Sequence, residues 1–371
     1  MESTEPGLVI ASLYSIVPSK KGVVPPPVRA LEYGMKFRPL RLTGTGLAVP
    51  ARAVSAAEID VRAGLRSGWT KRHAGVERRF FAEGETASQL GAAAARQALA
   101  EAGCALPEVD AIVCVGGTMQ QPIPCNAALL AAELGREADG LMTFDVNSTC
   151  LGFLTGLEVV SAQLMAGSYR RALIVAAEVG STGLDWSQPE SAAIIGDGAA
   201  AVVVESIEPD PPPVAPSPGI LATAFQTWPE GADLTTIRGG GTARHARHFS
   251  TAEEKHYLFQ MDGPGVFRLA SRHMPGFVSE FLGLHGWTWQ DFALVIPHQG
   301  SPASVALLRR RLGIPPERLF CYAADYGNTI AASIPMGLHL ARAAGRVTAG
   351  DRVLLLGTSA GFSMGAVALQ L

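Results

Sequence analysis

Three residues of this chain have side chains suited to chemistry on thioesters, namely Cys150, His298 and Asn328. Cys150 follows an apolar, strand-like run that ends at Val146 and precedes a long amphipathic helical pattern. We therefore expect its thiol at a helix N-terminus, where the helix dipole and free N–H groups lower the pKa of a thiol and favour the reactive thiolate. A thiolate attacks a thioester carbonyl readily and holds the acyl group while the first carrier leaves. The three residues together indicate acyl transfer through a thioester.

His298 and Asn328 suit a second step, in which a carbon nucleophile forms. His298 closes an apolar run, and Asn328 follows Gly327. If the second substrate is a malonyl thioester, loss of carbon dioxide leaves an enolate whose negative oxygen needs preorganised hydrogen-bond donors. Imidazole Nε2–H and the carboxamide can both donate without adding a fixed charge. The pair therefore predicts stabilisation of an enolate in a dry, apolar site.

The tetrahedral intermediate on Cys150 needs an oxyanion hole of its own, which backbone N–H groups provide most simply. The small residues of the turn Gly357-Thr358-Ser359-Ala360-Gly361 allow a close approach of the backbone. We nominate the N–H of Cys150 together with that of Ser359 or Ala360.

The elements that must position these residues alternate between strand and helix patterns, as parallel α/β folds require. Short apolar runs at 109–116 and 291–298 predict buried strands. Each is followed by a second apolar run, at 171–177 in the first half and at 352–356 in the second. A Gly-rich turn into a further strand comes next, at 196–204 and at 361–369. Helical patterns fill the gaps at 87–102, 151–165, 302–312 and 331–344. We infer an α/β fold built by internal duplication.

Composition limits the possible classes of function. The chain has 371 residues, of which 48% are hydrophobic and 17% charged, which indicates a folded globular protein. A formal net charge of -3 argues against a nucleic-acid binder. Its five cysteines show no paired CxxC spacing, which favours a reducing, cytoplasmic location without a disulfide framework. We expect neither a metal site nor a bound cofactor, and the apolar stretch at 8–17 is too short to span a membrane.

Three regions follow from these patterns. Residues 1–36 form an N-terminal extension, which we expect to be flexible or wrapped around a partner. Residues 37–207 form the half that carries Cys150, and residues 219–371 form the half that carries His298 and Asn328. The proline-rich stretch between the halves cannot pair as a central strand and marks their joint.

The motifs resemble the β-ketoacyl-acyl-carrier-protein synthase III group of the thiolase superfamily over roughly residues 40–371. The segments that carry the resemblance appear in the same order: the Cys150 region, Ile195-Gly196-Asp197-Gly198-Ala199, Pro297-His298-Gln299, Gly327-Asn328-Thr329, and the C-terminal glycine turn. The resemblance implies a five-layered αβαβα fold, a homodimer and a ping-pong condensation. It also implies a catalytic triad of Cys150, His298 and Asn328.

The resemblance also implies substrate contacts. Trp69 stands where the family stacks the adenine of coenzyme A, but His73 replaces the arginine that usually helps, and Pro189 falls where a second arginine is usual. Either acyl-CoA or an acyl carrier protein could therefore deliver the acyl group. Ile123 lies in the loop that reaches the partner subunit's acyl pocket in the family, and Phe153, beside the nucleophile, is a further expected substrate contact.

Arg309, Arg310 and Arg311 follow His298 on a helical pattern. They fit two roles equally well, either docking of an acidic acyl carrier protein or an ordinary solvated helix face.

Other functions with the same residue types fit less well. A papain-like protease needs Cys-Gly-Ser-Cys-Trp near its N-terminus, and a degradative thiolase needs a second cysteine in the C-terminal glycine turn, but neither is present. Head-to-head condensation of two acyl thioesters needs a carboxylate base near the loop around Ile123, here called the crossing loop. Gln120 and Gln121 stand there instead, so this reaction ranks second among the possible functions. Acyl transfer to oxygen or nitrogen ranks third. A partner-binding subunit without activity is the remaining alternative, and the retained triad argues against it.

Overall fold

The computed structural model of the chain describes residues 37–207 and 217–371. The N-terminal extension expected at 1–36 and most of the proline-rich joint lie outside these described residues. The described residues belong to one compact unit, and strands from both predicted halves share one sheet.

The strands repeat one arrangement twice. In the described part of the chain, one sheet has the order β11-β12-β13-β8-β1-β7-β6-β4-β5. The first half contributes β1 (Arg38–Ala48), β4 (Ala111–Val115), β5 (Met142–Val146), β6 (Arg171–Glu178) and β7 (Gly198–Ser206), and the second contributes β8 (Gly219–Thr227), β11 (Leu294–Pro297), β12 (Arg352–Ser359) and β13 (Ser363–Gln370). The order β4-β6-β7-β1 in one half thus matches β11-β12-β13-β8 in the other, which supports the inferred duplication.

The sheet is mixed, and the runs predicted at 109–116 and 291–298 form parallel strands in it. Strand β4 pairs in parallel with β5 and β6, and β11 pairs in parallel with β12. The last strand of each half runs back antiparallel, as β7 does on β6 and β13 on β12. Only three residues separate β12 from β13, and so short a turn joins antiparallel neighbours, since parallel ones need a long crossover.

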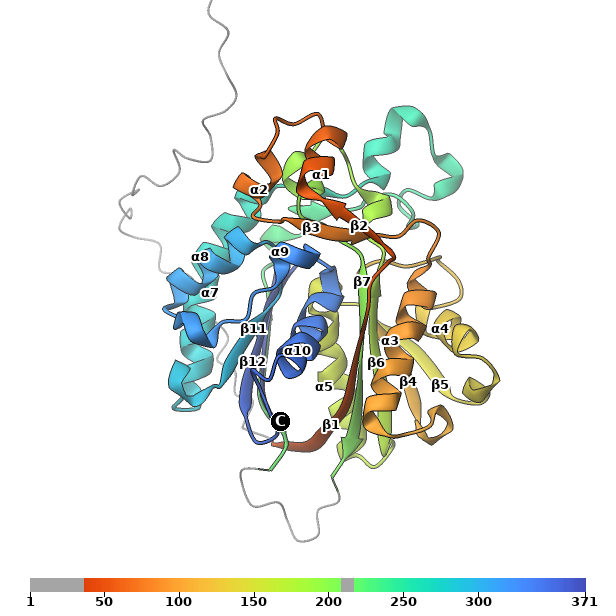
Figure 1. Ribbon diagram of the computed structural model, residues 1–371, viewed down its shortest axis with the longest axis vertical. Coiled ribbons are helices and arrows are strands. Elements are labelled where there is room, and N and C mark those ends of the chain that lie inside the picture. Colours follow the sequence, from red (N-terminus) through yellow and green to blue (C-terminus); the bar gives the residue numbers. More distant parts are fainter. Residues whose placement is uncertain (1–36, 208–216) are drawn as a thin grey trace, which may run out of the picture. The chain divides into compact units, whose positions relative to one another are not determined.

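Helices lie between and outside the two portions of the sheet, which gives five layers (Figure 1). The central layer contains α5 (Gly152–Met165) and α10 (Ser333–Ala343), one outer layer contains α3 (Ala87–Ala102) and α4 (Asn126–Leu134), and the other contains α7 (Gly263–Leu284) and α8 (Pro302–Leu312). The bounds of α3 and α8 match the patterns predicted from the sequence, whereas α5 and α10 begin one and two residues later.

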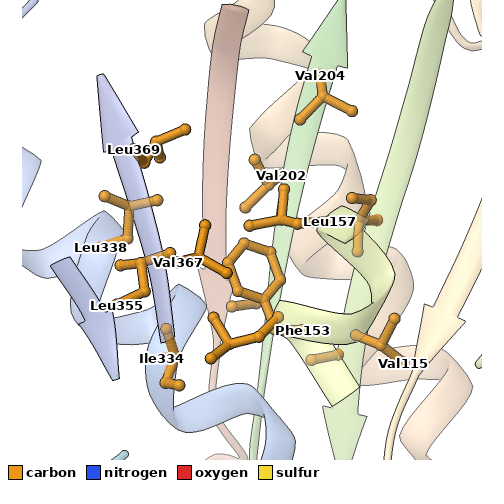
Figure 2. Packing of buried hydrophobic residues seen from close by; sticks show 14 of the residues in the cluster. Val115, Phe153, Leu157, Val202, Val204, Ile334, Leu338, Leu355, Val367 and Leu369 are labelled. Carbon is orange, nitrogen blue, oxygen red and sulfur yellow. The ribbon is translucent and has the colours of Figure 1, made fainter. Parts of the chain in front are cut away.

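The central helices are apolar because sheet strands cover them on both sides. Phe153 and Leu157 of α5 and Ile334 of α10 pack with strand residues such as Val202 and Val367 (Figure 2). A helix buried in this way is hydrophobic around most of its circumference. Burial fixes α5 and α10 rigidly, so the residues at their N-termini are held in place.

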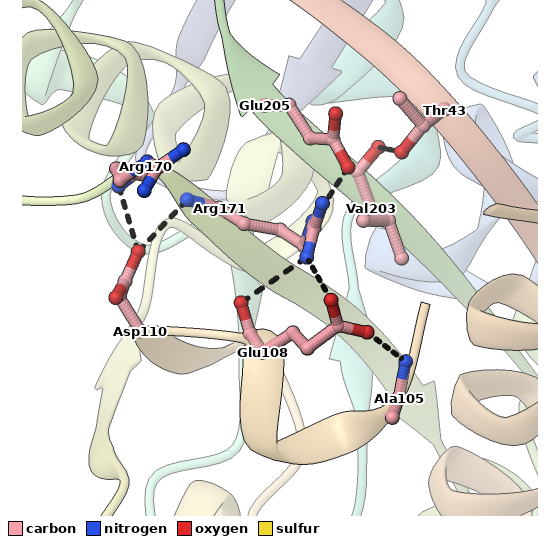
Figure 3. Close-up of polar contacts among 8 residues, drawn as sticks. All are labelled: Thr43, Ala105, Glu108, Asp110, Arg170, Arg171, Val203 and Glu205. Atoms are coloured by element: carbon pink, nitrogen blue, oxygen red, sulfur yellow. Dashed lines mark hydrogen bonds and ion pairs between the residues drawn. The ribbon is translucent and has the colours of Figure 1, made fainter. Parts of the chain in front are cut away.

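Polar contacts fix the register of the strands at the end where β6 begins (Figure 3). The Arg171 Nε–H donates to Glu205 of β7 at 2.5 Å, and the same guanidinium donates to the carbonyl of Glu108 at 3.3 Å. Asp110 accepts the backbone N–H of Arg171 at 2.9 Å. These contacts fix the first residue of β6, Arg171, and the strand therefore holds its last residue, Glu178, at a fixed position at its opposite end.

Besides short 3₁₀ turns, the described chain has these shorter helices and strands: α1 (Ala56–Arg62), α2 (Trp69–His73), α6 (Pro189–Ala192), α9 (Ala323–Tyr326), β2 (Arg52–Ser55), β3 (Arg78–Phe81), β9 (Thr235–Thr236) and β10 (Gln260–Met261). Among the helices described, none has both the length and the apolar character needed to cross a membrane.

The contact between β1 and α3 gives a test of the packing. A Cβ at Gly46 would lie 2.0 Å from the carbonyl oxygen of Ala94 on α3. We expect Gly46→Ala to lower the free energy of unfolding by about 1–3 kcal/mol, because strand and helix must move apart. Urea denaturation followed by circular dichroism measures the change.

Gly283 on α7 is the matched control, since a Cβ there meets no atom within 4 Å. Gly283→Ala should leave stability unchanged or raise it by up to about 1 kcal/mol. Equal stability of Gly46→Ala and wild type would contradict the close packing of β1 on α3.

Candidate active site

Cys150 lies in a tight turn between β5 and α5, as its sequence context predicts. The turn, Thr149–Leu151, is a single 3₁₀ turn that leads directly into Gly152 of α5. Thr149 has a φ of 44°, which is unusual for a β-branched residue and needs support from its surroundings. Gly117 gives that support, because a Cβ there would lie 3.3 Å from the Thr149 Cα. The backbone at the nucleophile is thus held by close packing.

The C-terminal hairpin contacts this turn directly. The Ser359 hydroxyl donates to the carbonyl of Ser148 at 2.9 Å, and its oxygen also hydrogen-bonds the Thr149 hydroxyl. The end of β12 at Ser359, and with it the turn that begins at Ala360, therefore lies beside the turn of Cys150, where the sequence predicts a partner for the oxyanion hole. The donor role of these two N–H groups stays a prediction.

His298 reaches the same place from the end of β11. Its backbone N–H donates to the Leu356 carbonyl at 2.8 Å, and this hydrogen bond continues the pairing of β11 with β12. A Cβ built at Gly357 would lie 3.3 Å from the His298 Cβ and 2.9 Å from a Leu151 methyl group. Only a glycine at this point lets the histidine and the nucleophile's turn approach so closely.

The buried side chain of Gln299 fixes the backbone on which His298 stands. Its amide donates to the carbonyls of Pro297 and Phe320 at 2.8 and 3.1 Å, and its oxygen accepts the Tyr322 N–H at 3.0 Å. All of these partners are backbone groups, so Gln299 connects the end of β11 to the segment that precedes α9.

The imidazole of His298 is neutral and has a defined partner. Burial lowers its pKa to about 4. Its Nδ1 lies 2.7 Å from the hydroxyl of Ser333, the first residue of α10, and the Ser333 carbonyl accepts the Tyr322 hydroxyl at 2.5 Å. When the serine hydroxyl donates to Nδ1, the histidine proton is on Nε2, which is the donor that the sequence analysis requires.

Asn328 is held by a backbone clamp from the Gly196-Asp197-Gly198 region. Its backbone N–H donates to the Ile194 carbonyl at 2.7 Å, and its backbone carbonyl accepts the Gly196 N–H at 3.0 Å. The side-chain Oδ1 accepts the Ile330 N–H at 2.9 Å, so the amide is oriented with its NH₂ as the remaining donor. Glycine is required at 196, since a Cβ there would lie 2.3 Å from the Tyr326 carbonyl oxygen.

The structure adds a residue that the sequence analysis missed. Glu178, at the end of β6, is fully buried and accepts hydrogen bonds from the loop after β4 and from Ala331, three residues after Asn328. Burial raises its pKa to about 7, against the opposing effect of its hydrogen bonds. A carboxylate directly after a buried apolar strand was the only signal in the sequence.

Our expectation that the pKa of Cys150 is lowered was wrong. Burial, followed by the nearby charge of Glu178, raises the pKa of the thiol to about 12, although its own backbone N–H acts in the opposite direction. The residue as a whole is partly accessible, but its thiol is buried, and removal from water outweighs the effect of the helix N-terminus. At neutral pH the resting residue is a thiol.

The residues expected to bind coenzyme A lie on α2. The rings of Trp69 and His73 stack with centroids 4.5 Å apart, and His73 Nδ1 lies 2.9 Å from the Trp69 carbonyl oxygen. The helix ends beside α8, since a Cβ at Gly75 would lie 2.9 Å from the Pro302 side chain. His73 thus covers one face of the indole on which an adenine was expected to stack.

Phe153 does not have the position we expected. Its side chain is 1% exposed and packs into the central cluster of Figure 2, so it is a core residue and not a substrate contact in this structure. Ile123 is instead 84% exposed, in the loop between β4 and α4. Pro189 is the first residue of α6 and offers no positive charge to a phosphate.

The arginine cluster forms the last turn of α8. Arg310 and Arg311 are exposed, and Arg309 is half-buried. Within the described residues none of the three forms an ion pair with an acidic side chain. Among the same residues no group of three or more His, Cys, Asp or Glu side chains is placed to hold a metal ion.

The raised pKa of Cys150 predicts its reactivity. We expect its alkylation by iodoacetamide to rise about tenfold per pH unit up to at least pH 10, since the thiolate fraction keeps increasing. A peptide thiol, with a pKa near 8.5, levels off earlier and serves as the control. Mass spectrometry of the peptide that contains Cys150 measures the rate, and a plateau below pH 8 would contradict the neutral thiol.

Comparisons with known proteins identify relatives over most of the chain. The 3-oxoacyl-[acyl-carrier-protein (ACP)] synthase III model matches residues 144–222, and its C-terminal counterpart matches residues 282–371. The β-ketoacyl-[acyl-carrier-protein] synthase III of Rhodobacter capsulatus is 34% identical over 328 residues, which cover 88% of this chain and 97% of that protein. The protein of the same name from Symbiobacterium thermophilum is 33% identical and covers 91% and 99% of the two chains.

Solved structures show the same fold. The 3-oxoacyl-[acyl-carrier-protein] synthase III of Aquifex aeolicus superposes with a TM-score of 0.78 at 30% identity, over 90% of this chain and 100% of that chain. Xanthomonas campestris OleA also has a TM-score of 0.78, over 91% of this chain and 100% of that chain, but at 21% identity it is evidence of the fold alone. The site geometry, the matched regions and the near-complete coverage of curated relatives lead to one conclusion: this chain belongs to the β-ketoacyl-[acyl-carrier-protein] synthase III family, with a thiolase-like fold.

Proposed function

We propose that the protein is a condensing enzyme that loads an acyl group onto Cys150 and extends it by decarboxylative Claisen condensation with a malonyl-type thioester. The observation that carries this proposal is the convergence of three segments: Gly357 lies between Leu151 and His298, and Gly117 lies between Thr149 and Ile330, whose N–H binds the Asn328 carboxamide. This packing brings the residues that can supply two neutral hydrogen-bond donors, His298 and Asn328, to the turn of Cys150. The names of the curated relatives support the same reaction class.

In the first half-reaction the Cys150 sulfur attacks the acyl thioester. The bond between acyl carbon and carrier sulfur breaks, and the thiol proton passes to the departing carrier thiol. The Ser333 hydroxyl, 2.7 Å from His298 Nδ1, can accept as well as donate. When it accepts from Nδ1–H, Nε2 is free to take the thiol proton during the attack, which matters because the thiol is neutral at rest.

In the second half-reaction a malonyl thioester loses carbon dioxide. The electrons of the broken C–C bond form an enolate, whose oxygen accepts hydrogen bonds from His298 Nε2–H and the Asn328 NH₂. The enolate carbon then attacks the acyl carbonyl, and the bond to Cys150 breaks. The sulfur takes up a proton, which returns the site to its resting state.

The acyl carriers are part of the proposal. Arg310 and Arg311 offer exposed positive charge on α8, the helix that begins shortly after His298, and would suit an acidic acyl carrier protein. The stacking of His73 on Trp69 favours such a carrier over coenzyme A, since an adenine has to use the other face of the indole or displace the imidazole. The chemistry needs no cofactor beyond the phosphopantetheine arm of the substrate.

We also propose a homodimer and a cytoplasmic location. Strand β5 is at one edge of the sheet, and its neighbourhood exposes Met142 (54%), Met119 (64%) and Ile123 (84%). An exposed edge strand with apolar side chains favours pairing with a second copy of the chain. All five cysteines are free, which agrees with a reducing compartment.

Head-to-head condensation remains the second candidate, but no observation favours it. Gln120 and Gln121 in the crossing loop bond to backbone groups, the N–H of Ser88 and the carbonyl of Ile123, and neither can act as a base. Glu178 is a buried carboxylate near Cys150, but hydrogen-bond donors already surround it.

Acyl loading separates the roles of the triad. We expect Cys150→Ala to abolish the mass increase seen after incubation with acyl thioesters. His298→Ala and Asn328→Ala should still become acylated, His298→Ala more slowly because it lacks the acceptor of the thiol proton. Both should release carbon dioxide from malonyl-acyl carrier protein at least about 100-fold more slowly, since each loses one enolate donor. Intact-mass spectrometry and a carbon dioxide release assay measure the two steps.

Two outcomes would overturn these assignments. Equal loading of wild type and Cys150→Ala would refute the nucleophile, and normal decarboxylation by both donor variants would refute the enolate site.

The dimer is tested at the β5 edge. Met142→Lys places a charge on the exposed apolar edge and should shift the mass measured by light scattering from dimer towards monomer. Met165→Lys is the matched control, because Met165 is similarly exposed (51%) but lies at the C-terminal end of α5. A wild-type protein that is monomeric at all concentrations would contradict the proposal.

A further inference from the structure

Glu178 is the most heavily hydrogen-bonded side chain near the candidate nucleophile. Its Oε1 accepts the N–H of Gly117 at 2.8 Å and that of Ala331 at 3.3 Å. Its Oε2 accepts the N–H of Thr118 at 3.0 Å and also the Thr118 hydroxyl. One carboxylate thus connects the loop that follows β4 to the turn that follows Asn328.

These two segments support the unusual backbone on both sides of the site. Gly117 lies between Thr149 and Ile330, since a Cβ on it would be 3.3 Å from the Thr149 Cα and 3.2 Å from an Ile330 methyl group. Thr149 and Ile330 are the non-glycine residues with positive φ in the described chain, at 44° and 52°. One of them directly precedes Cys150, and the other donates its N–H to the Asn328 carboxamide.

The negative charge of Glu178 has no positive partner. Among the described residues no lysine, arginine or histidine forms an ion pair with it. The residues that donate to it and their neighbours, 116–118 and 330–332, have no titratable side chain. Gly116 separates the carboxylate from the start of α5, since a Cβ on Gly116 would lie 3.2 Å from Glu178 Oε1 and a Cβ on Gly152 would lie 3.1 Å from the Gly116 nitrogen. From this position the charge of Glu178 adds to the effect of burial and raises the pKa of Cys150. Asp197, the other buried carboxylate next to β7, is hydrogen-bonded to Ser181.

We propose that Glu178 is a positioning residue of the condensing reaction, which holds the Cys150 and Asn328 backbones in register and places a negative charge close to the start of the nucleophile's helix. This inference rests on the proposed function. It assigns Glu178 two separable effects, one geometric and one electrostatic.

The negative charge of Glu178 assists the last step of the catalytic cycle, in which the Cys150 sulfur regains its proton. When the enolate carbon attacks the acyl group, the C–S bond breaks and the electron pair remains on the Cys150 sulfur. A neighbouring carboxylate favours uptake of a proton by that sulfur and so completes release of the product. The acylated enzyme carries no charge on sulfur, so Glu178 does not oppose the thioester itself.

Two substitutions separate the effects. Glu178→Gln keeps the length of the side chain but removes the charge, and Glu178→Asp keeps the charge but shortens the reach by one methylene group. Alkylation of Cys150 by iodoacetamide at pH 8 should rise at least about threefold in Glu178→Gln, because removal of the neighbouring charge lowers the pKa of the thiol. It should stay within about twofold of wild type in Glu178→Asp.

Carbon dioxide release from malonyl-acyl carrier protein reports the geometric effect. Both variants should be slower than wild type by about tenfold or more, because neither can hold the two segments as the glutamate does. A purely structural residue would slow release in both variants without changing the pH dependence of alkylation in either. Unchanged alkylation profiles in both variants would therefore overturn the electrostatic part, and normal release would overturn the geometric part.

Thr118→Val tests the same idea if Glu178→Gln does not fold. It removes one donor to the carboxylate and keeps the backbone N–H groups, so more of Glu178 is protonated at neutral pH. Alkylation should rise as in Glu178→Gln, but by less, and an unchanged rate would contradict the charge effect. Wild-type protein without decarboxylase activity would refute the proposed function, while the alkylation assay would still test the charge of Glu178.

Discussion

Exclusion of water from the surroundings of one sulfur and one imidazole is the constraint on which this structure depends. Burial raises the pKa of Cys150 to about 12 and lowers that of His298 to about 4, so neither group carries a charge at rest. A neutral imidazole and a neutral amide can stabilise a developing enolate without attracting water or counterions to the site. The same dryness disfavours a free thiolate, so the attack of sulfur on the acyl group has to be coupled to movement of its proton.

Backbone contacts, more than side-chain pairs, keep these groups in place. Asn328 is held by main-chain hydrogen bonds on both sides, His298 by its pairing with β12, and the turn of Cys150 by glycines that admit close packing. Glu178 and Gln299 act in the same way, since most of their partners are backbone N–H and carbonyl groups. A rigid frame of this kind preorganises the donors before the substrate arrives. The two central helices, buried on both sides, extend the frame through the core.

The sequence was informative where local pattern determines structure. The amphipathic pattern of α3 and α8 gave their bounds, and the strand-to-helix context of Cys150 gave its turn. Strand direction could not be read in this way, because whether a strand returns antiparallel depends on the connection. The pKa of Cys150 was wrong in direction because it depends on burial by distant segments. Phe153 was misjudged because closeness in sequence to the nucleophile does not show which side of a helix faces the core.

The charge state of His298 tests this account most directly. Nitrogen-15 NMR of histidine-labelled protein distinguishes the neutral imidazole from the cation and shows which nitrogen carries the proton. We predict a His298 resonance, assigned by its loss in His298→Ala, that stays neutral from pH 5.5 to pH 8, because its pKa is near 4. A His298 that is cationic at pH 6 would show that water and charge enter the site, and the proposed neutral-donor mechanism would be wrong.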